Sequence, residues 1–261
     1  MNTSPLQIFR SVIFALFLRE LKTRFGESRL GYAWIVLEPM LHIVMLLVIF
    51  SVFSNQMMPQ VPFSLFLITG LIPFFLFKHI AMALMGSIPA NLALFSYKPV
   101  KPFSVYITRT ILEVLIYGAI FGLILVVFWW FSLVPFSIAF PLELIGTTVL
   151  IILFSVSIGI ALSVLVHKFE SLRMLVNIAF TLLYFLSGIM YPLWVIPSEY
   201  LRYLQYNPLL HLIEMFRESF FSYYPQVEGI SLTLPFWTIL VMGYIGMWFY
   251  TKRESLLRSS T

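Results

Sequence analysis

The sequence contains no cysteine and no aspartate, and only 10% of its residues are charged. The lack of cysteine excludes a disulfide framework, a thiolate metal site and a thiol nucleophile. The lack of aspartate, with no cluster of carboxylates at a membrane face, removes the usual ligands for metal-assisted phosphoryl or glycosyl chemistry. The G-x-x-x-x-G-K-[ST] phosphate-binding loop is also missing. A process driven by ATP would therefore need a second chain to bind the nucleotide.

What the sequence has in abundance is apolar surface. Hydrophobic residues make up 61% of the 261 positions, and the mean hydropathy is +0.97. A soluble domain would have about a quarter of its residues charged. The apolar runs are long and continuous rather than alternating, which favours membrane helices over a barrel. The composition predicts an all-α integral membrane protein, with residues 1–261 forming a single transmembrane domain.

Residues 5–27 are predicted to form an amphipathic helix at the membrane interface. Phe14, Leu18, Leu21 and Phe25 recur at helical spacing and would share one face. Polar or charged side chains cover the rest of the helix toward its end: Arg19, Lys22, Thr23, Arg24 and Glu27. An apolar face opposite a cationic face is typical of a helix lying in the headgroup region. The segment is not a cleavable signal, because its apolar stretch carries charges and lacks a small-residue cleavage site.

Six apolar segments are long enough to cross a hydrocarbon core of roughly 30 Å as helices. They are residues 33–53, 63–85, 105–131, 141–166, 172–191 and 231–250. Residues 89–102 form a proline-punctuated connector between the second and third spans. Residues 192–230 are too polar to span and too apolar for a free loop, so we expect short re-entrant helices there on the outer face. That segment places Leu209, Leu212, Ile213, Phe216 and Phe220 on one stripe, with Glu214, Arg217 and Glu218 opposite.

The net charge of +5 is distributed by position. Lysine and arginine precede the first span, flank the connectors after the second and fourth spans, and recur in the tail. The turns after the first and third spans have neither, and the 192–230 segment has only Arg202 and Arg217. This pattern predicts a multi-pass protein with both termini in the cytoplasm, and it assigns the basic residues to topology rather than to nucleic acid.

Four stretches resemble a known family. FLRELKTRFGESRLGYAWIVLEPM, LFSYKPVKP, SGIMYPLWVIP and YNPLLHLIEMFRE are similar to the membrane subunit of ABC exporters of capsular polysaccharide, within the wider ABC-2 exporter family. The resemblance follows nearly the whole chain in order. It implies a channel-forming permease of the bacterial inner membrane that moves lipid-anchored acidic capsular polysaccharide from cytoplasm to periplasm.

The same resemblance implies the partners. The chain would form a homodimer bound to two copies of a cytoplasmic ATP-binding subunit, which would carry the ATP and Mg²⁺, with no cofactor on this chain. A periplasmic co-polymerase-type adaptor and an outer-membrane export protein would complete the route. The chain itself would be a transport subunit and not an enzyme, and its substrate would be an anionic glycolipid.

The segment joining the interface helix to the first span is a candidate cytoplasmic mouth for the substrate. Its candidate residues are Arg19, Arg24, Arg29, Tyr32 and Trp34. Guanidinium groups suit carboxylates and phosphates. The alternative is attraction to anionic headgroups, at about 1 kcal/mol for each basic residue.

Candidate channel-lining residues are Glu38, His42, Tyr184 and Tyr191. Glu38 and His42 lie one helical turn apart in the first span, and ionisable groups at that depth should face protein or water. They could line the route or pair with Lys78 or His79 of the second span. The alternative is a buried polar contact that fixes helix packing.

Two further groups carry predictions. The connector after the second span would couple to the ATPase subunit through Ser96, Tyr97, Lys98 and Lys101, or serve as a simple turn with topogenic lysines. The outer segment would form a gate or a partner contact through Trp194, Glu199, Glu214, Arg217 and Glu218, or present a solvated helix face. Arg109 and Glu113, one turn apart, are expected to make a structural ion pair within or between helices.

Three alternatives for function stay open. One is an ABC-2 exporter of another cargo, such as O-antigen, teichoic acid or a small hydrophobic molecule. Another is a polytopic enzyme acting on lipid-linked sugars, which the missing carboxylate cluster opposes. The third is an ion-coupled secondary transporter, which would predict broken helices in related halves, and no such repeat occurs.

Overall fold

A computed structural model describes residues 4–25, 29–50, 61–97, 99–131, 133 and 136–259, and within these ranges all regular structure is helical. The side chains of residues 25, 29–36, 50 and 253–259 lie outside the description. The longer helices are α1 (Pro5–Phe25), α2 (Arg29–Phe50), α4 (Phe63–Met85), α6 (Pro102–Trp130), α7 (Pro141–Lys168), α8 (Leu172–Leu186) and α11 (Thr233–Ser259). The shorter ones are α5 (Ser87–Asn91), η1 (Leu92–Leu94), η2 (Leu193–Val195), α9 (Ser198–Leu204) and α10 (Pro208–Phe220).

Within the described ranges, four helices are long and apolar enough to cross a membrane: α4, α6, α7 and the Thr233–Lys252 part of α11. Two shorter apolar helical segments, Leu37–Ile49 and Leu172–Leu186, lie in α2 and α8. α8 ends before the predicted boundary at residue 191, because the chain turns at Ser187 and Gly188, where Gly188 has φ +66°. The helical membrane fold is thus confirmed, while six crossings remain a prediction.

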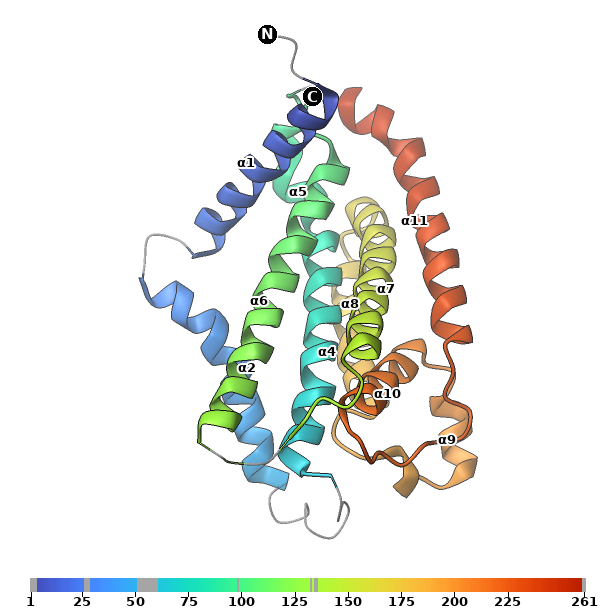
Figure 1. Cartoon of the computed structure of the whole chain (residues 1–261). Helices are drawn as coiled ribbons and strands as arrows, with labels where there is room; N and C mark the ends of the chain where they lie inside the picture. Colours follow the sequence, from blue (N-terminus) through green and yellow to red (C-terminus); the bar gives the residue numbers. More distant parts are fainter. Residues whose placement is uncertain are drawn as a thin grey trace.

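α4 is the centre of the bundle. In its most apolar stretch 78% of the residues are buried, against 17% in that of α11. α6 and α7 pack on either side of α4, and α11 packs on the outside of α7 (Figure 1). Small residues bring the helices close: a Cβ at Gly159 of α7 would lie 2.9 Å from the Leu84 side chain of α4. Close approach at small residues is how membrane helices gain packing energy without a hydrophobic driving force.

Local sequence sets the helix ends. Proline is at the first turn of α6, α7 and α10, where its fixed φ fits and no donor is lost. Asn207 caps α10 by accepting a hydrogen bond from the Leu209 backbone N–H at 3.0 Å. Buried hydroxyls inside the helices bond to the preceding turn, as Thr69 does to the Leu65 carbonyl at 2.7 Å. These polar groups are therefore satisfied within their own helix, as a bilayer requires.

The molecule has two distinct ends. The start of α1, the short helix α5 and the end of α11 lie together at one end, and α9 and α10 lie at the other (Figure 1). The start of α1 and the end of α11 therefore lie on the same side of the bundle, which fits an even number of crossings. Which side faces the cytoplasm remains a prediction from the charge pattern.

Candidate functional site: a polar cavity where α1, α2, α4 and α6 meet

A cavity of about 420 Å³ lies among α1, α2, α4 and α6. Most of its lining side chains are ionisable or aromatic. The lining consists of Arg24, Glu38, Pro39, His42, Phe75, Lys78, His79, Glu113, Ile116 and Tyr117. The structure therefore brings the predicted neighbours Glu38, His42, Lys78 and His79 into one site. Intramembrane ionisable residues are expensive to bury and mark functional sites in most membrane proteins.

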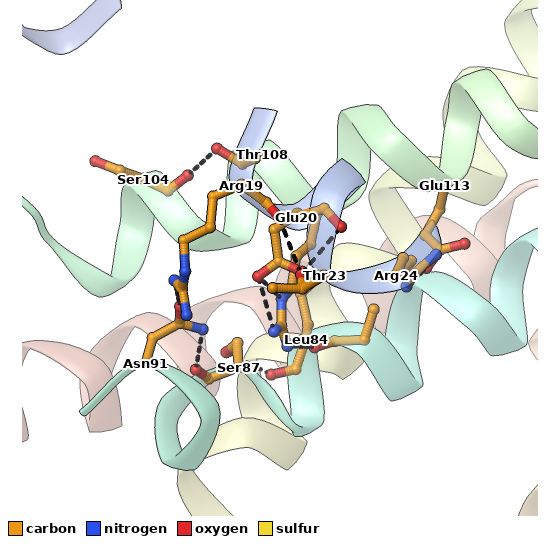
Figure 2. A network of polar contacts seen from close by, with 12 residues as sticks. Arg19, Glu20, Thr23, Arg24, Leu84, Ser87, Asn91, Ser104, Thr108 and Glu113 are labelled. Atoms are coloured by element: carbon orange, nitrogen blue, oxygen red, sulfur yellow. Dashed lines mark hydrogen bonds and ion pairs between the residues drawn. The ribbon is translucent and has the colours of Figure 1, made fainter. Parts of the chain in front are cut away.

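Three polar contacts attach α1 to the bundle beside this cavity (Figure 2). Arg19 donates through Nη1 to the Asn91 Oδ1 atom of α5 at 2.6 Å. Arg109 of α6 donates through Nε and Nη2 to Glu20 Oε1 at 3.0 and 2.9 Å. Arg24 pairs with Glu113 of α6. α1 is thus linked to both the connector and the third predicted span.

Arg109 and Glu113, which the sequence predicts to form an ion pair, do not pair with each other. Both residues make interhelical ion pairs, but their partners are Glu20 and Arg24 of α1 rather than each other. The contact between helices was one of the two expected forms. Its partners lie 89 residues away in sequence, beyond the reach of helical spacing.

The orientation predicted for α1 needs correction. Leu16 and Glu20 are buried against the bundle, whereas Phe14 and Leu18 are 62% and 43% exposed. Arg19 and Arg24 therefore reach α5 and α6, whereas Lys22 is exposed and part of the apolar stripe faces outward. In a bilayer that outward stripe meets lipid, and polar contacts with the bundle engage part of the cationic face that the sequence predicted to be solvated.

The structure shows side-chain contacts for two of the five candidate mouth residues. Arg19 and Arg24 are engaged by Asn91 and Glu113. Arg29, Tyr32 and Trp34 belong to α2, but their side chains lie outside the described part of the chain. The role of this group in substrate binding therefore stays a prediction.

Two of the four candidate channel residues, His42 and Tyr184, contact each other, and the other two do not. His42 Nε2 lies 2.8 Å from the Tyr184 hydroxyl of α8, so α2 and α8 touch through a polar contact. Glu38 is exposed at the cavity and makes no ion pair among the described residues. Tyr191 lies after α8 and donates its hydroxyl hydrogen to the Phe185 carbonyl at 2.7 Å. This bond gives Tyr191 a local structural partner.

The predicted coupling connector begins earlier than expected. α5 starts at Ser87 and contains Pro89, and residues 95–97 turn toward α6. Ser96 bonds its hydroxyl to the Ala93 carbonyl at 2.8 Å, and Tyr97 is 64% exposed. Lys101 is exposed immediately before α6, while Lys98 lies outside the described residues. The Tyr97 ring is thus exposed beyond α5, at the end of the bundle where α1 starts and α11 ends.

In the outer segment, Glu214 and Arg217 are 1% and 0% exposed, so the solvated helix face, one of the two alternatives, does not hold for them. Their role as a gate or partner contact stays a prediction. Arg217 Nη1 donates to Glu214 Oε1 at 2.7 Å and to the Gly188 carbonyl at 2.8 Å. Its Nη2 atom donates to the Ile189 carbonyl at 2.9 Å, and its guanidinium carbon lies 3.7 Å from the centroid of the Phe66 ring. The Glu214–Arg217 ion pair is therefore buried where α10, the turn after α8 and α4 meet.

Of the remaining gate candidates, Trp194 and Glu218 lie close to this pair. The Tyr224 hydroxyl donates to Glu214 Oε2 at 2.8 Å, and burial together with the Glu214 charge raises the Tyr224 pKa well above its ordinary value. The Trp194 ring lies 5.3 Å from that of Tyr224. Burial and the nearby carboxylates of Glu214 and Glu143 raise the pKa of Glu218. Glu199 is exposed.

Sequence reasoning missed Glu20, Asn91, Phe75 and Tyr117 as members of these sites. Glu20 belongs to the same amphipathic helix as the basic residues, and an acidic residue among them was the available signal. Phe75 and Tyr117 had no such signal, because they are two of many aromatic residues in apolar runs. Among the described residues, no group of three or more histidine or acidic side chains could hold a metal ion.

Comparison with known proteins agrees with this architecture. The ABC-2 type transporter family matches residues 11–221. The chain is 40% identical over 260 residues to the polysialic acid transport protein KpsM of Escherichia coli, covering 100% of both chains. It is 28% identical to the O-antigen export system permease protein RfbA of Klebsiella pneumoniae, over 90% of this chain and 88% of that one. It is 26% identical to the capsule polysaccharide export inner-membrane protein CtrC of Neisseria meningitidis, over 83% and 82%.

The described helices and these matches together establish the family. The matched region runs from α1 to the residue that follows α10, and so contains both the polar cavity and the buried Arg217 pair. The chain belongs to the ABC-2 type transporter family.

Proposed function

We propose that this chain is the channel-forming membrane subunit of an ATP-driven exporter of acidic capsular polysaccharide. The observation that carries the proposal is the 40% identity, over the full length of both chains, to a polysialic acid transport protein. The lack of a phosphate-binding loop supports a division of labour in which a separate cytoplasmic subunit binds ATP and Mg²⁺. Two copies of this chain and two of that subunit would form the inner-membrane unit, joined to a periplasmic adaptor and an outer-membrane export protein.

In this proposal the connector after α4 receives the movement of the ATPase subunit. Ser96, Tyr97, Lys98 and Lys101 would dock on it at the end of the molecule that holds α5. Arg19 links α1 to Asn91 of α5, so a displaced connector would pull on α1. The substrate lipid would approach where α1 meets α2, near Arg24, Arg29, Tyr32 and Trp34. The glycan would pass along α2 and α8, and the segment from Trp194 to Glu218 would close the outer side.

Co-purification tests the proposal. The chain is expressed with the ATPase encoded beside it, and ATP turnover is measured with and without an acidic lipid-linked glycan. We expect a complex of two plus two subunits and faster turnover with the glycolipid. Tyr97→Ala should weaken the complex without lowering the melting temperature of the isolated chain, because this ring is exposed. A chain that binds no ATPase would contradict the proposal.

The O-antigen export relative supports a second cargo class. An E. coli strain lacking its own polysialic acid transport protein separates the two. Restored surface polysialic acid would favour the acidic capsule, whereas stimulation of ATP turnover by a neutral O-antigen glycolipid alone would favour the second class.

A further inference from the structure

We propose that the polar cavity binds the headgroup of a zwitterionic phospholipid that carries a primary ammonium group, of the phosphoethanolamine type. This lipid would be a bound component of the membrane and not the exported cargo. The proposal does not depend on which polysaccharide the chain exports. It rests on an unpaired carboxylate oxygen, the balance of charge and the aromatic rings of the lining.

The unpaired oxygen is Glu113 Oε2. Glu113 is 1% exposed and lines the cavity, and its Oε1 atom pairs with Arg24. Its Oε2 atom has no hydrogen-bond partner among the described residues. A buried carboxylate oxygen without a donor costs free energy, so this wall of the cavity favours a ligand with N–H or O–H groups.

The charges of the cavity balance. Arg24 and Lys78 are basic, Glu38 and Glu113 are acidic, and His42 and His79 complete the ionisable lining. Arg24 is held by Glu113, so of the two basic residues in the lining, Lys78 is the one that makes no ion pair among the described residues. An anionic headgroup would gain Lys78 but would meet two carboxylates. A zwitterion suits both signs, since its phosphate can face Lys78 while its ammonium faces Glu38 and Glu113.

Aromatic rings line the same space. The rings of His79 and Tyr117 lie 5.0 Å apart, and Phe75 lies 6.4 Å from each of them. An ammonium group near these rings would gain a cation–π contribution in addition to its carboxylate contacts.

The helices that line the cavity also carry exposed leucines. Leu37 and Leu41 of α2 are 43% and 51% exposed, and Leu115 of α6 is 55% exposed; each is the sequence neighbour of a lining residue. In a membrane, exposed leucines on these helices meet acyl chains. A polar cavity between helices with apolar outer faces fits an amphiphile whose headgroup enters the protein while its chains remain in the bilayer.

Three phospholipids with identical acyl chains test the proposal on the full chain purified in detergent and stripped of lipid. They are phosphatidylethanolamine, phosphatidylcholine and phosphatidylglycerol, and binding is measured by native mass spectrometry and by the rise in melting temperature. Phosphatidylcholine has the same net charge but no N–H donor for Glu113 Oε2. We expect phosphatidylethanolamine to bind about tenfold more tightly than either of the others, as one charge-assisted hydrogen bond predicts.

Variants assign the preference to the cavity. Glu38→Gln keeps Glu113 and its pair with Arg24, so it should reduce the preference for phosphatidylethanolamine without abolishing it, and Lys78→Met should weaken the binding of both zwitterionic lipids. Glu170→Gln, an exposed glutamate in the turn after α7, should leave the preference unchanged.

Two outcomes would overturn the proposal. One is equal binding of phosphatidylethanolamine and phosphatidylcholine, which would show that no donor is required. The other is a preference for phosphatidylglycerol that Lys78→Met abolishes, which would make the cavity a site for anionic lipid, including the anchor of an exported glycolipid.

Discussion

Arg217 fixes the outer segment because it is held by backbone carbonyls as well as by a carboxylate. Its contacts reach Glu214, the turn at Gly188 and Ile189, and the Phe66 ring of α4. Removing one partner of a buried ion pair leaves the other charge uncompensated and costs about 3–5 kcal/mol. The network therefore couples α10 to the centre of the bundle.

Gly70 makes room for this arginine. A Cβ at position 70 would overlap the Arg217 guanidinium group and lie 3.1 Å from the Ile189 carbonyl oxygen. We expect Gly70→Ala to destabilise the protein by about 1–3 kcal/mol, the usual cost of overpacking. The measurement is the melting temperature in detergent. Gly118→Ala is the matched control, because a Cβ there meets nothing within 4 Å, and it should leave stability unchanged or slightly higher. Equal effects at the two sites would contradict the close packing of Arg217.

Glu218 should make stability depend on pH. Burial and the neighbouring carboxylates Glu214 and Glu143 raise its pKa in the folded state above the ordinary value of 4.5. The folded state then binds a proton more tightly than the unfolded state, so this residue lowers the unfolding free energy as pH rises from 4.5 to its folded pKa. Glu218→Gln should remove that contribution. Melting temperatures of the two proteins across this pH range check it: the variant should gain relative to the original as pH rises. A constant difference would contradict the prediction, and exposed Glu199→Gln serves as the control.

At the scale of elements, side-chain contacts hold α1 against α5 and α6. Its contacts run from Asn91 of α5 to Glu113 of α6, so it lies along the bundle beside the start of α6 (Figure 2). In a chain whose connector moves, such a helix would move with α5 and carry that movement to the polar cavity.

A charge exchange tests this attachment. The Arg109 and Glu20 side chains are 12% and 9% exposed, so Arg109→Glu would place two carboxylates together in a buried contact. We expect this variant to lose about 3–5 kcal/mol of stability. The double variant Arg109→Glu with Glu20→Arg should recover part of the loss. Recovery would be incomplete because Arg109 also donates to the Ala83 carbonyl at 2.7 Å. Melting temperatures of the four proteins in a double-mutant cycle give the coupling energy, and purely additive losses would contradict a direct pair.

At the scale of the whole molecule, the start of α1 and the end of α11 lie with α5, and α9 and α10 lie at the opposite end (Figure 1). The charge pattern predicts that the α5 end is cytoplasmic. The helical bundle alone has no preferred direction in a membrane, so labelling must determine it.

The absence of native cysteine makes this labelling direct. Tyr223, beyond α10, is 80% exposed, and Tyr97, beyond α5, is 64% exposed. In spheroplasts we expect a membrane-impermeant maleimide to label Tyr223→Cys but not Tyr97→Cys, and both after permeabilisation. The reverse pattern would show the opposite orientation, and the cysteine-free parent chain gives the background.

The sequence by itself determined the class of protein, because 61% hydrophobic residues in long runs can be stable only as helices in a bilayer. It also located α4, α6 and α7 closely, since proline and apolar run length mark helix ends locally. The motifs that resemble polysaccharide exporters indicated the family, which the comparisons then confirmed.

Only the tertiary structure decided where the charges lie. Helical spacing relates residues three or four apart, whereas Arg24 meets Glu113 and Arg109 meets Glu20 across 89 residues. The same spacing placed Glu214 and Arg217 opposite an apolar stripe, but α10 is enclosed on both sides, so its polar face pairs internally instead of meeting water. In an apolar medium a charge is stable only beside its partner, and the partner is chosen by how the helices pack.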